Sequence, residues 1–421
     1  MAKRMRGTFH LQSFFVCLVV FLLCIDFSKS SVLTLSQIPV IKYLFINLGN
    51  NRLIILTIGI YLIIVFLDKY HVDNDILVKT WMLFAFGILA ILISLSRNIS
   101  SGSAFYDISV LLLLCVMLSF RLKSHQKLAE NTILFLGYIE GVLGLYQHFA
   151  RITIFSPYFG EKLYLNTVFY LNGFSSNNPV YLNYGAQVRS FGTMDSGLSF
   201  GLFMLLCLAI VLSRTTYSKG WRFTNLVFFG LAIFGTITRN VYIGAILLLV
   251  LVLGGRRLTL KGGRFKTIYI IGSMVGILTP WFERLITLLG KISTALNIPS
   301  FLDRFSFMDS ALTQIRGIGD FLWGRQVVSG IQNPIDNVFV ASMLNNGAVF
   351  AISLLLILYQ AFSVLLKDAS ETQFAKLWYL ALLPLLGTFN NIIVAMSFGT
   401  ALVIMTIPAE SKIKEISEMN E

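Results

Sequence analysis

The chain has 421 residues, of which 56% are hydrophobic and 13% are charged, and its formal net charge at pH 7 is +13. Soluble domains carry about one quarter charged residues, so this composition excludes a soluble protein and predicts one polytopic membrane domain over residues 1–421. The positive charge does not indicate nucleic-acid binding, because Lys and Arg lie in short segments between apolar runs and no zinc-finger spacing or RNA-binding signature is present.

Twelve apolar runs come close to the length of about 20 residues that a membrane-spanning helix needs. They cover residues 11–27, 52–67, 80–96, 105–120, 130–150, 191–213, 223–238, 240–254, 267–287, 337–360, 377–393 and 394–408. The first run follows Lys3, Arg4 and Arg6 and therefore also resembles a signal peptide, although no clean small-residue cleavage site follows it. The sequence thus predicts an all-α integral membrane protein with about twelve transmembrane helices.

The distribution of basic residues predicts the orientation of these helices. With the N-terminus inside, the cytoplasmic segments hold 20 of the 33 Lys and Arg residues, although the outer segments are longer. Short cytoplasmic segments of membrane proteins are enriched in Lys and Arg. We therefore expect both termini on the cytoplasmic side of the cytoplasmic (inner) membrane, and two long extracytoplasmic loops, residues 151–190 and 285–336.

The second long loop carries a helical pattern. Met308, Ala311, Leu312 and Ile315 follow the i, i+3, i+4, i+7 spacing of an amphipathic helix. The sequence predicts such a helix over 304–316, lying on the outer surface, and leaves open whether it is catalytic or only structural. The first long loop is rich in Tyr and Asn, which fits either sugar binding or an interfacial aromatic belt.

Arginines on the outer side need an explanation, because the positive-inside rule disfavours them there. Arg189 opens the run 191–213, Arg239 lies in the short turn after 223–238, and Arg304 lies in the second long loop. Each can extend its side chain to the lipid headgroups. Three arginines on segments that can converge instead indicate an anion site, because a guanidinium group is always charged and binds phosphate oxygens in pairs.

Carboxylates within apolar runs are costly and indicate either function or a structural pairing. Asp195 lies in the run 191–213, close to Arg189 in sequence, and Glu140 lies in the run 130–150. All four histidines lie outside the second long loop, so a general base acting there has to be a carboxylate. Among the carboxylates of the second long loop, Asp336 is the best placed, because it lies where the loop leads back into an apolar run.

The sequence shows no sign of a cofactor. There is no Walker A motif, no GxGxxG after a strand, no HExxH and no DxD-like pair. Cys17, Cys24, Cys115 and Cys207 lie in or at the end of apolar runs, and their spacing supports neither a disulfide framework nor a metal site. We expect free thiols, no metal and no bound nucleotide.

Three segments resemble motifs of a known family. They are RSFGTMDSG at 189–197, TITRNVYIGAILLL at 236–249 and GDFLWGRQVVSGIQNPIDNVFVASMLNNGAVFAI at 319–352. In order and spacing they resemble the O-antigen polymerase and O-antigen ligase superfamily, polytopic enzymes of bacterial surface-polysaccharide assembly. Asp336 stands where many ligases of that superfamily have histidine, which favours the polymerase side.

The resemblance implies roles for individual residues. Arg189 and Arg239 would contact the pyrophosphate of a polyprenyl-linked oligosaccharide and act in catalysis. Asp336 would be the catalytic residue near the acceptor hydroxyl. Four further residues would bind substrate: Arg304, Asn337, Asp195 and Arg325. The implied partners are the undecaprenyl-pyrophosphate-linked donor and acceptor, the bilayer, and a chain-length regulator and a flippase of the same pathway.

The resemblance thus leads us to expect a membrane glycosyltransferase that polymerises lipid-linked repeat units into surface polysaccharide on the outer face of the cytoplasmic membrane. A ligase of the same superfamily, which moves finished glycan to another acceptor, is the alternative enzyme. A flippase or transporter of lipid-linked oligosaccharide is the alternative outside enzymes. The flippase fits twelve spans, but it favours short outer loops and charges that line a central cavity, whereas this chain concentrates charge in its outer loops.

Overall fold

A computed structural model describes most of the chain. The described residues are 2–27, 39–67, 70–97, 101–150, 158–159, 162–163, 189–194, 196–255, 263–278, 291, 312–324, 337–388 and 392–409. Nearly all of them are helical. The strands among them form two short antiparallel pairs, β1 (Tyr70–His71) with β2 (Arg121–Leu122) and β3 (Tyr158–Phe159) with β4 (Lys162–Leu163).

Each of the twelve predicted apolar runs contains a helix. In chain order these are α1 (Ala2–Phe27), α3 (Pro39–Leu67), α4 (Asn74–Arg97), α5 (Ser101–Ser119), α6 (Gln126–Ala150), α8 (Gly197–Ser213), α9 (Lys219–Gly235), α10 (Arg239–Gly255), α11 (Gly263–Leu278), α15 (Val338–Asp368), α16 (Phe374–Gly387) and α17 (Ile393–Thr406). Two short elements, α14 (Ile318–Trp323) and η4 (Glu371–Gln373), also lie within the described residues. The prediction of a mainly helical chain is confirmed for the described residues.

Not all of these helices have the dimensions of a membrane span. Within the described ranges, α4, α6 and α15 are long and apolar enough to cross a membrane, and seven further apolar helices are shorter. The count of about twelve transmembrane helices therefore stays a prediction. The three long apolar helices support a helical protein with segments that can span a membrane.

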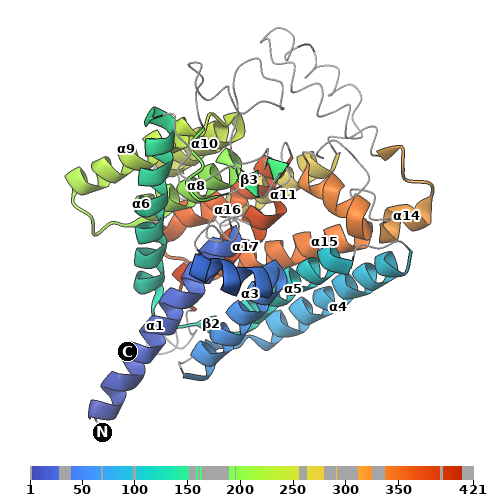
Figure 1. Cartoon of the computed structure of the whole chain (residues 1–421), viewed down its shortest axis with the longest axis horizontal. Coiled ribbons are helices and arrows are strands. Elements are labelled where there is room, and N and C mark those ends of the chain that lie inside the picture. The colour runs from blue at the N-terminus through green and yellow to red at the C-terminus, as the bar shows by residue number, and fades with distance from the viewer. Residues whose placement is uncertain are drawn as a thin grey trace.

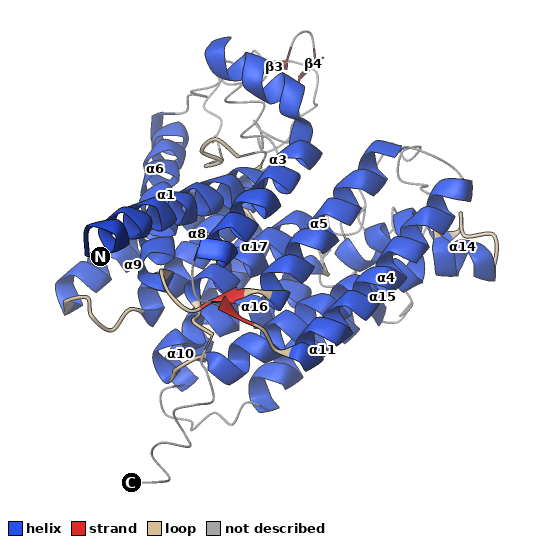
Figure 2. Ribbon diagram, turned by 90° about the horizontal axis from the view of Figure 1, so that it is seen from below, coloured by secondary structure: helices blue, strands red, loops and turns tan. Residues whose placement is uncertain are grey.

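Two groups of helices lie on either side of a central pair (Figure 1). One group contains α6, α8, α9 and α10, and the other contains α4, α5, α14 and α15. Helices α16 and α17 lie between them, as the turned view also shows (Figure 2). Nearly every residue of α8, α16 and α17 is buried, so these three helices form the core of the described structure.

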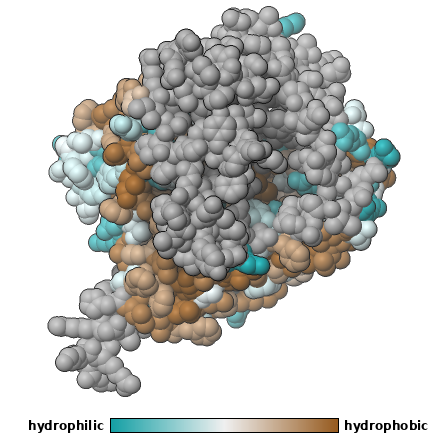
Figure 3. Space-filling view, viewed as in Figure 1, coloured by the Kyte–Doolittle hydropathy of each residue, from teal (hydrophilic) through white to brown (hydrophobic). Residues whose placement is uncertain are grey.

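Large apolar side chains point outward along the peripheral helices. On α4, the exposed ones are Val78, Met82, Phe86, Leu89 and Leu92, spaced three or four residues apart. This spacing places them on one face of the helix. A water-soluble protein rarely exposes such continuous apolar patches, whereas a lipid-facing surface requires them. Apolar side chains are also visible on the surface of the described helices in Figure 3, in agreement with a membrane protein.

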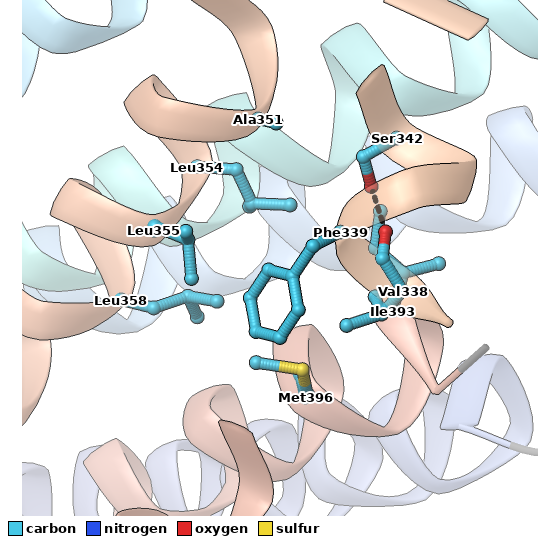
Figure 4. A pocket seen from close by; sticks show the side chains of 9 residues that line it. All are labelled: Val338, Phe339, Ser342, Ala351, Leu354, Leu355, Leu358, Ile393 and Met396. Atoms are coloured by element: carbon cyan, nitrogen blue, oxygen red, sulfur yellow. Dashed lines mark hydrogen bonds between the residues drawn. The ribbon is translucent and has the colours of Figure 1, made fainter. Parts of the chain in front are cut away.

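Helix α15 is broken at Gly347, which has φ +87° and ψ 167°. Phe339, from the first half, lines the same small cavity as Leu354 and Leu358, from the second half. In a straight helix, residues 15 positions apart are separated by about 22 Å. The half-helix 338–346 therefore folds back along the second half, and Figure 4 shows the two halves side by side with Phe339 between them. The predicted span over 337–360 therefore consists of two helical segments, and the break falls at Gly347, in the Asn345, Asn346 and Gly347 triplet that interrupts the apolar run in the sequence.

Helix α14 packs into this break. A Cβ atom on Gly324, which has φ +72°, would lie 2.4 Å from the Gly347 nitrogen. At the other end of α14, Asp320 forms an ion pair of 3.4 Å with Arg97, the last residue of α4. Ser94 of α4 also donates a hydrogen bond of 2.8 Å to the Asn345 carbonyl. The end of α4, the short helix α14 and the break in α15 therefore form one packed unit.

The two predicted outer loops fall mostly outside the described residues. From 151–190 the structure describes β3, β4 and residues 189–190, and from 285–336 it describes residue 291 and the range 312–324. The predicted amphipathic helix over 304–316 is described only from Leu312 onward, and of these last residues Leu312 alone is helical.

Buried ion pairs lie where α6 begins. Glu130 of α6 accepts hydrogen bonds from Lys376 Nζ at 2.7 Å and from Arg214 Nε at 3.0 Å. Arg121, which is 2% exposed, pairs with Asp368 at the end of α15. We call this end of the bundle, defined by Glu130, Lys376 and Arg214, the Glu130 end. Its basic residues belong to the segments that the sequence assigns to the cytoplasmic side.

Candidate functional site

The predicted anion-binding segment RSFGTM is a turn and not the start of a helix. The prediction began the apolar helix at residue 191, but α8 starts at Gly197, and the Ser196 side chain caps it by accepting a hydrogen bond from Ser199 N at 3.2 Å. Gly192 has φ +58°, a conformation that glycine adopts readily and that lets the chain turn here. The spacing between Arg189 and the following residues is therefore not helical.

Gln147 of α6 holds this turn from one side. Its Oε1 accepts hydrogen bonds from Phe191 N at 3.2 Å and from Gly192 N at 2.8 Å. Its Nε2 donates to the Gly192 carbonyl at 2.8 Å. The side chain is fully buried. Because three of its hydrogen bonds go to two consecutive backbone units, Gln147 fixes the conformation of the turn.

Glu140 lies seven residues before Gln147 on α6. It holds the same loop segment at Thr193, the residue after Gly192. Its Oε2 accepts a hydrogen bond from Thr193 N at 2.8 Å, and its Oε1 accepts one from the Thr193 hydroxyl at 2.6 Å. A Cβ atom on Gly192 would lie 2.0 Å from Glu140 Oε2, so only glycine fits between turn and carboxylate. The contacts that the structure gives to this carboxylate hold the backbone.

The turn is also joined to the end of α9. Ser190 N donates to the Gly235 carbonyl at 2.7 Å, and the Ser190 hydroxyl donates to the Gly144 carbonyl of α6 at 2.8 Å. Ser190 is fully buried. Arg189 precedes Ser190 in the chain and therefore lies beside Gly235, the last residue of α9.

A second turn, residues 236–238, lies beside the first and leads into α10. The Thr238 hydroxyl donates to the Thr236 carbonyl at 3.0 Å, and Thr236 Oγ1 accepts from Thr238 N at 3.2 Å. A Cβ atom on Gly197 would lie 3.0 Å from the Thr236 carbonyl, so the start of α8 packs against this turn. Arg239 follows as the first residue of α10, and its side chain is exposed.

The structure thus brings together two of the three predicted outer arginines. Arg189 and Arg239 are 50 positions apart in sequence, yet both stand at the end of the bundle where α8 and α10 begin. The half-buried Arg189 also lies close enough to Tyr242 of α10 for its charge to act on that hydroxyl. Helix N-termini carry partial positive charge and favour anions. We call this end of the bundle the arginine end.

His148 also belongs to the arginine end. Its ring lies against the end of α9, because a Cβ atom on Gly235 would be 3.4 Å from His148 Cγ, and it contacts the ring of Phe234 at 6.4 Å between centroids. The sequence analysis had placed every histidine away from the second long loop and did not connect His148 with Arg189.

Gln147 was missed for a physical reason. A side chain that fixes a turn 45 residues later leaves no local pattern in the sequence. A partial signal exists, because Glu140 and Gln147 are seven residues apart and therefore share one face of α6. Gly137, Gly141 and Gly144 run along the same helix, and their lack of side chains lets Cys207, Phe228 and Phe200 approach closely.

Asn337 lies at the start of α15. Its Oδ1 accepts hydrogen bonds from Phe339 N at 2.9 Å and Val340 N at 3.1 Å, and its Nδ2 donates to the Gly276 carbonyl of α11 at 3.1 Å. The residue is fully buried. Its observed contacts are those of an N-cap that holds α15 on α11, and they orient the chain where it enters α15. The other predicted site residues, Asp336, Asp195, Arg304 and Arg325, lie outside the described residues.

Within the described part of the chain, no group of three or more His, Cys, Asp or Glu side chains is arranged to hold a metal ion. The four cysteines are free thiols, of which Cys17 is half-buried and the others are buried. Comparison of the chain with protein families, curated proteins and solved structures gives no match. The resemblance to the O-antigen superfamily therefore rests on its three sequence segments.

Proposed function

We propose that the protein is a membrane glycosyltransferase that polymerises polysaccharide repeat units carried on undecaprenyl pyrophosphate, on the outer face of the cytoplasmic membrane. The observation that supports this proposal is the position of Arg189 and Arg239 on two adjoining turns at the arginine end. Two guanidinium groups beside the N-termini of α8 and α10 suit a diphosphate, which carries several negative charges in a small volume.

In the proposed reaction, the bond between the anomeric carbon of the donor glycan and the lipid pyrophosphate breaks. The hydroxyl oxygen of the acceptor unit forms the new glycosidic bond, and its proton passes to a base. Negative charge develops on the departing pyrophosphate. Arg189 and Arg239 stabilise that charge, and because Gln147 and Glu140 hold the turn in advance, little reorganisation is needed during the reaction.

We assign the base to Asp336, which precedes Asn337 in the chain. The buried N-cap of Asn337 fixes the start of α15 against α11, and so acts as a positioning contact for the residue before it. Arg304, Arg325 and Asp195 complete the proposal as further contacts to the lipid-linked substrate. Cleavage of the glycosyl–phosphate bond of the donor supplies the energy.

The proposal is tested by glycan chain length on the lipid carrier in cells that express Arg189→Ala or Arg239→Ala. We expect single repeat units to accumulate and polymer to fall about 100-fold or more, the usual loss when one group that stabilises a developing anion is removed. Arg264→Ala is the matched control. Arg264 is also an exposed arginine in the first turn of a helix, α11, and it is separated from the arginine end by the length of α10.

Two other outcomes point to the alternatives. Long glycan stranded on the lipid carrier would identify a ligase, and single repeats trapped on the cytoplasmic face would identify a flippase. Near-normal chain length in both arginine variants, with the protein still in the membrane, would contradict a role of the arginine end in catalysis.

A further inference from the structure

Tyr242 of α10 contacts the end of α9 across the turn 236–238, and the proposed reaction gives it no role. It lies three positions after Arg239, so the two side chains are neighbours on one face of α10. Its hydroxyl donates a hydrogen bond to the Phe234 carbonyl, eight residues back in the chain. Its ring stacks on the Phe234 ring, with 6.3 Å between the centroids and 12° between the planes. Both contacts connect α10 to α9 and span the turn.

The turn that Tyr242 spans is strained. Ile237 has φ +49°, in the left-handed region that a β-branched residue rarely adopts. Such a conformation is costly, persists only when the surrounding structure holds it, and is found most often at functional sites. The backbone N–H of Ile237 acts on the Tyr242 hydroxyl oxygen. The hydroxyl is therefore one of the groups that hold the strained turn, two residues before Arg239.

The same hydroxyl lies close to the turn that carries Arg189. The charge of Arg189 acts on the hydroxyl. Ser190, the next residue, donates its N–H to the Gly235 carbonyl at 2.7 Å, and Gly235 directly follows the residue that accepts the hydrogen bond from Tyr242. Tyr242 therefore connects the segment beside Arg189 with the helix that begins at Arg239.

We propose that Tyr242 is a positioning residue that sets the distance between Arg189 and Arg239, so that both guanidinium groups reach one diphosphate. The inference rests on the proposed function for its ligand. Without the hydroxyl, the strain at Ile237 is released and Arg239 moves relative to Arg189. Two cations bind a diphosphate well only when both fit it at once, so the loss falls on their joint effect and not on either arginine alone.

The test measures binding of inorganic pyrophosphate to the purified full-length protein in detergent. A ligand that binds only the folded state raises the unfolding temperature, and sodium chloride at equal ionic strength is the reference. Tyr242→Phe keeps the ring and removes the hydroxyl alone, and we expect it to weaken the apparent affinity about tenfold. Arg239→Ala should also weaken it. The double variant should bind no more weakly than Arg239→Ala, because the hydroxyl then has no second arginine to place.

Tyr61→Phe is the matched control. The Tyr61 hydroxyl of α3 also donates to the backbone carbonyl of a phenylalanine, Phe120, at 2.6 Å. Phe120 precedes Arg121, which binds the Ile407 carbonyl, and Lys376 binds the adjacent carbonyl, so this bond lies near the Glu130 end. The control variant loses a hydrogen bond of the same kind and should keep the full affinity for pyrophosphate.

Equal affinities for pyrophosphate in the parent protein and Tyr242→Phe would overturn the proposal, as would losses that multiply in the double variant. A parent protein whose unfolding temperature does not rise with pyrophosphate would overturn it as well. Glycan chain length in cells with Arg189→Ala or Arg239→Ala tests the proposed function separately. Normal chain length, together with pyrophosphate binding that depends on Tyr242, would refute the glycosyl transfer and leave the positioning role intact.

Discussion

Lys376 is a fully buried cation that depends on one carboxylate. Its Nζ contacts Glu130 Oε1 and the Thr406 carbonyl, whereas Glu130 has a second cation, Arg214, on its other oxygen. We therefore expect an asymmetry. Glu130→Gln should lower the free energy of unfolding by about 3 kcal/mol, because it leaves a buried ammonium group without its counter-ion. Lys376→Met should cost about 1 kcal/mol or less, because Glu130 keeps Arg214.

Unfolding of the purified protein in detergent checks this prediction. The double variant Glu130→Gln/Lys376→Met should recover most of the loss, because the isolated buried charge is removed. Lys219→Met, a change of the same type at an exposed position at the start of α9, is the control and should be near neutral. Equal losses for Glu130→Gln and Lys376→Met would contradict the asymmetry.

Individual residues also show how much of the arginine end could be predicted from the sequence. An anion site is predicted from Arg189, Arg239 and Arg304, because charge on the side that disfavours arginine stands out against the positive-inside pattern. The sequence singled out Glu140 but did not connect it with the turn after Arg189, and it did not single out Gln147. Gln147 acts on backbone 45 residues away, and His148 joins the site only because α9 ends beside it. Such contacts depend on tertiary packing.

At the scale of elements, the break in α15 depends on glycine. Gly347 has φ +87°, and a Cβ atom there would lie 2.2 Å from the Leu322 carbonyl of α14. Gly347→Ala should therefore lower the free energy of unfolding by at least about 2 kcal/mol, from backbone strain and from displacement of α14. Gly230→Ala is the control. Gly230 lies inside α9 with nothing within 4 Å of an added Cβ, so the change should be neutral or stabilising by up to about 1 kcal/mol.

Thermal unfolding of the two glycine variants measures the difference. Susceptibility of the 312–324 segment to a protease added to the folded protein gives a second readout, which should rise in Gly347→Ala alone because α14 loses its packing site. Unchanged unfolding and unchanged cleavage in Gly347→Ala would mean that the two halves of α15 form one ordinary helix.

The positions of helices were predictable and the shape of α15 was not. Long apolar runs identify helices through composition, and each predicted run indeed contains one. Asn345, Asn346 and Gly347 interrupt the apolar run 337–360 in the sequence, but this pattern does not show that the chain reverses direction there. The reversal arises because Gly324, 23 positions earlier, packs directly against Gly347. The late start of α8 has a similar origin, in the contacts of Gln147 and Glu140 with the preceding turn.

At the scale of the whole molecule, the two ends of the bundle differ in how they treat charge. At the Glu130 end, the cations Lys376 and Arg214 share the carboxylate of Glu130 as an ion-pair partner within the protein. At the arginine end, Arg239 is exposed beside two helix N-termini. A charge that the protein does not bury is available to a ligand or to lipid phosphate. The sequence predicts from counts of Lys and Arg that the Glu130 end faces the cytoplasm. The difference in how the two ends bury their charges is a physical argument for the same orientation.

Helix α6 allows this orientation to be tested, because it runs from Gln126 to Ala150 and is long and apolar enough to cross a membrane. Its 25 residues span about 37 Å, which is long enough to place its two ends on opposite sides of a bilayer. Lys127 and Ala150 are exposed at these two ends. We expect a membrane-impermeant maleimide to label Ala150→Cys on intact cells, and Lys127→Cys only in inverted membrane vesicles.

The parent protein is the background control, and its labelling should be low because its own cysteines are buried or half-buried. The reverse labelling pattern would place the arginine end in the cytoplasm. That result would contradict the proposed reaction, which takes place on the outer face. Nucleotide-activated donors are available in the cytoplasm, so a transferase with Arg189 and Arg239 on that side would not need a lipid pyrophosphate leaving group. Labelling of Ala150→Cys from outside would instead put the two arginines on the face where only the lipid-linked donor carries the energy for transfer.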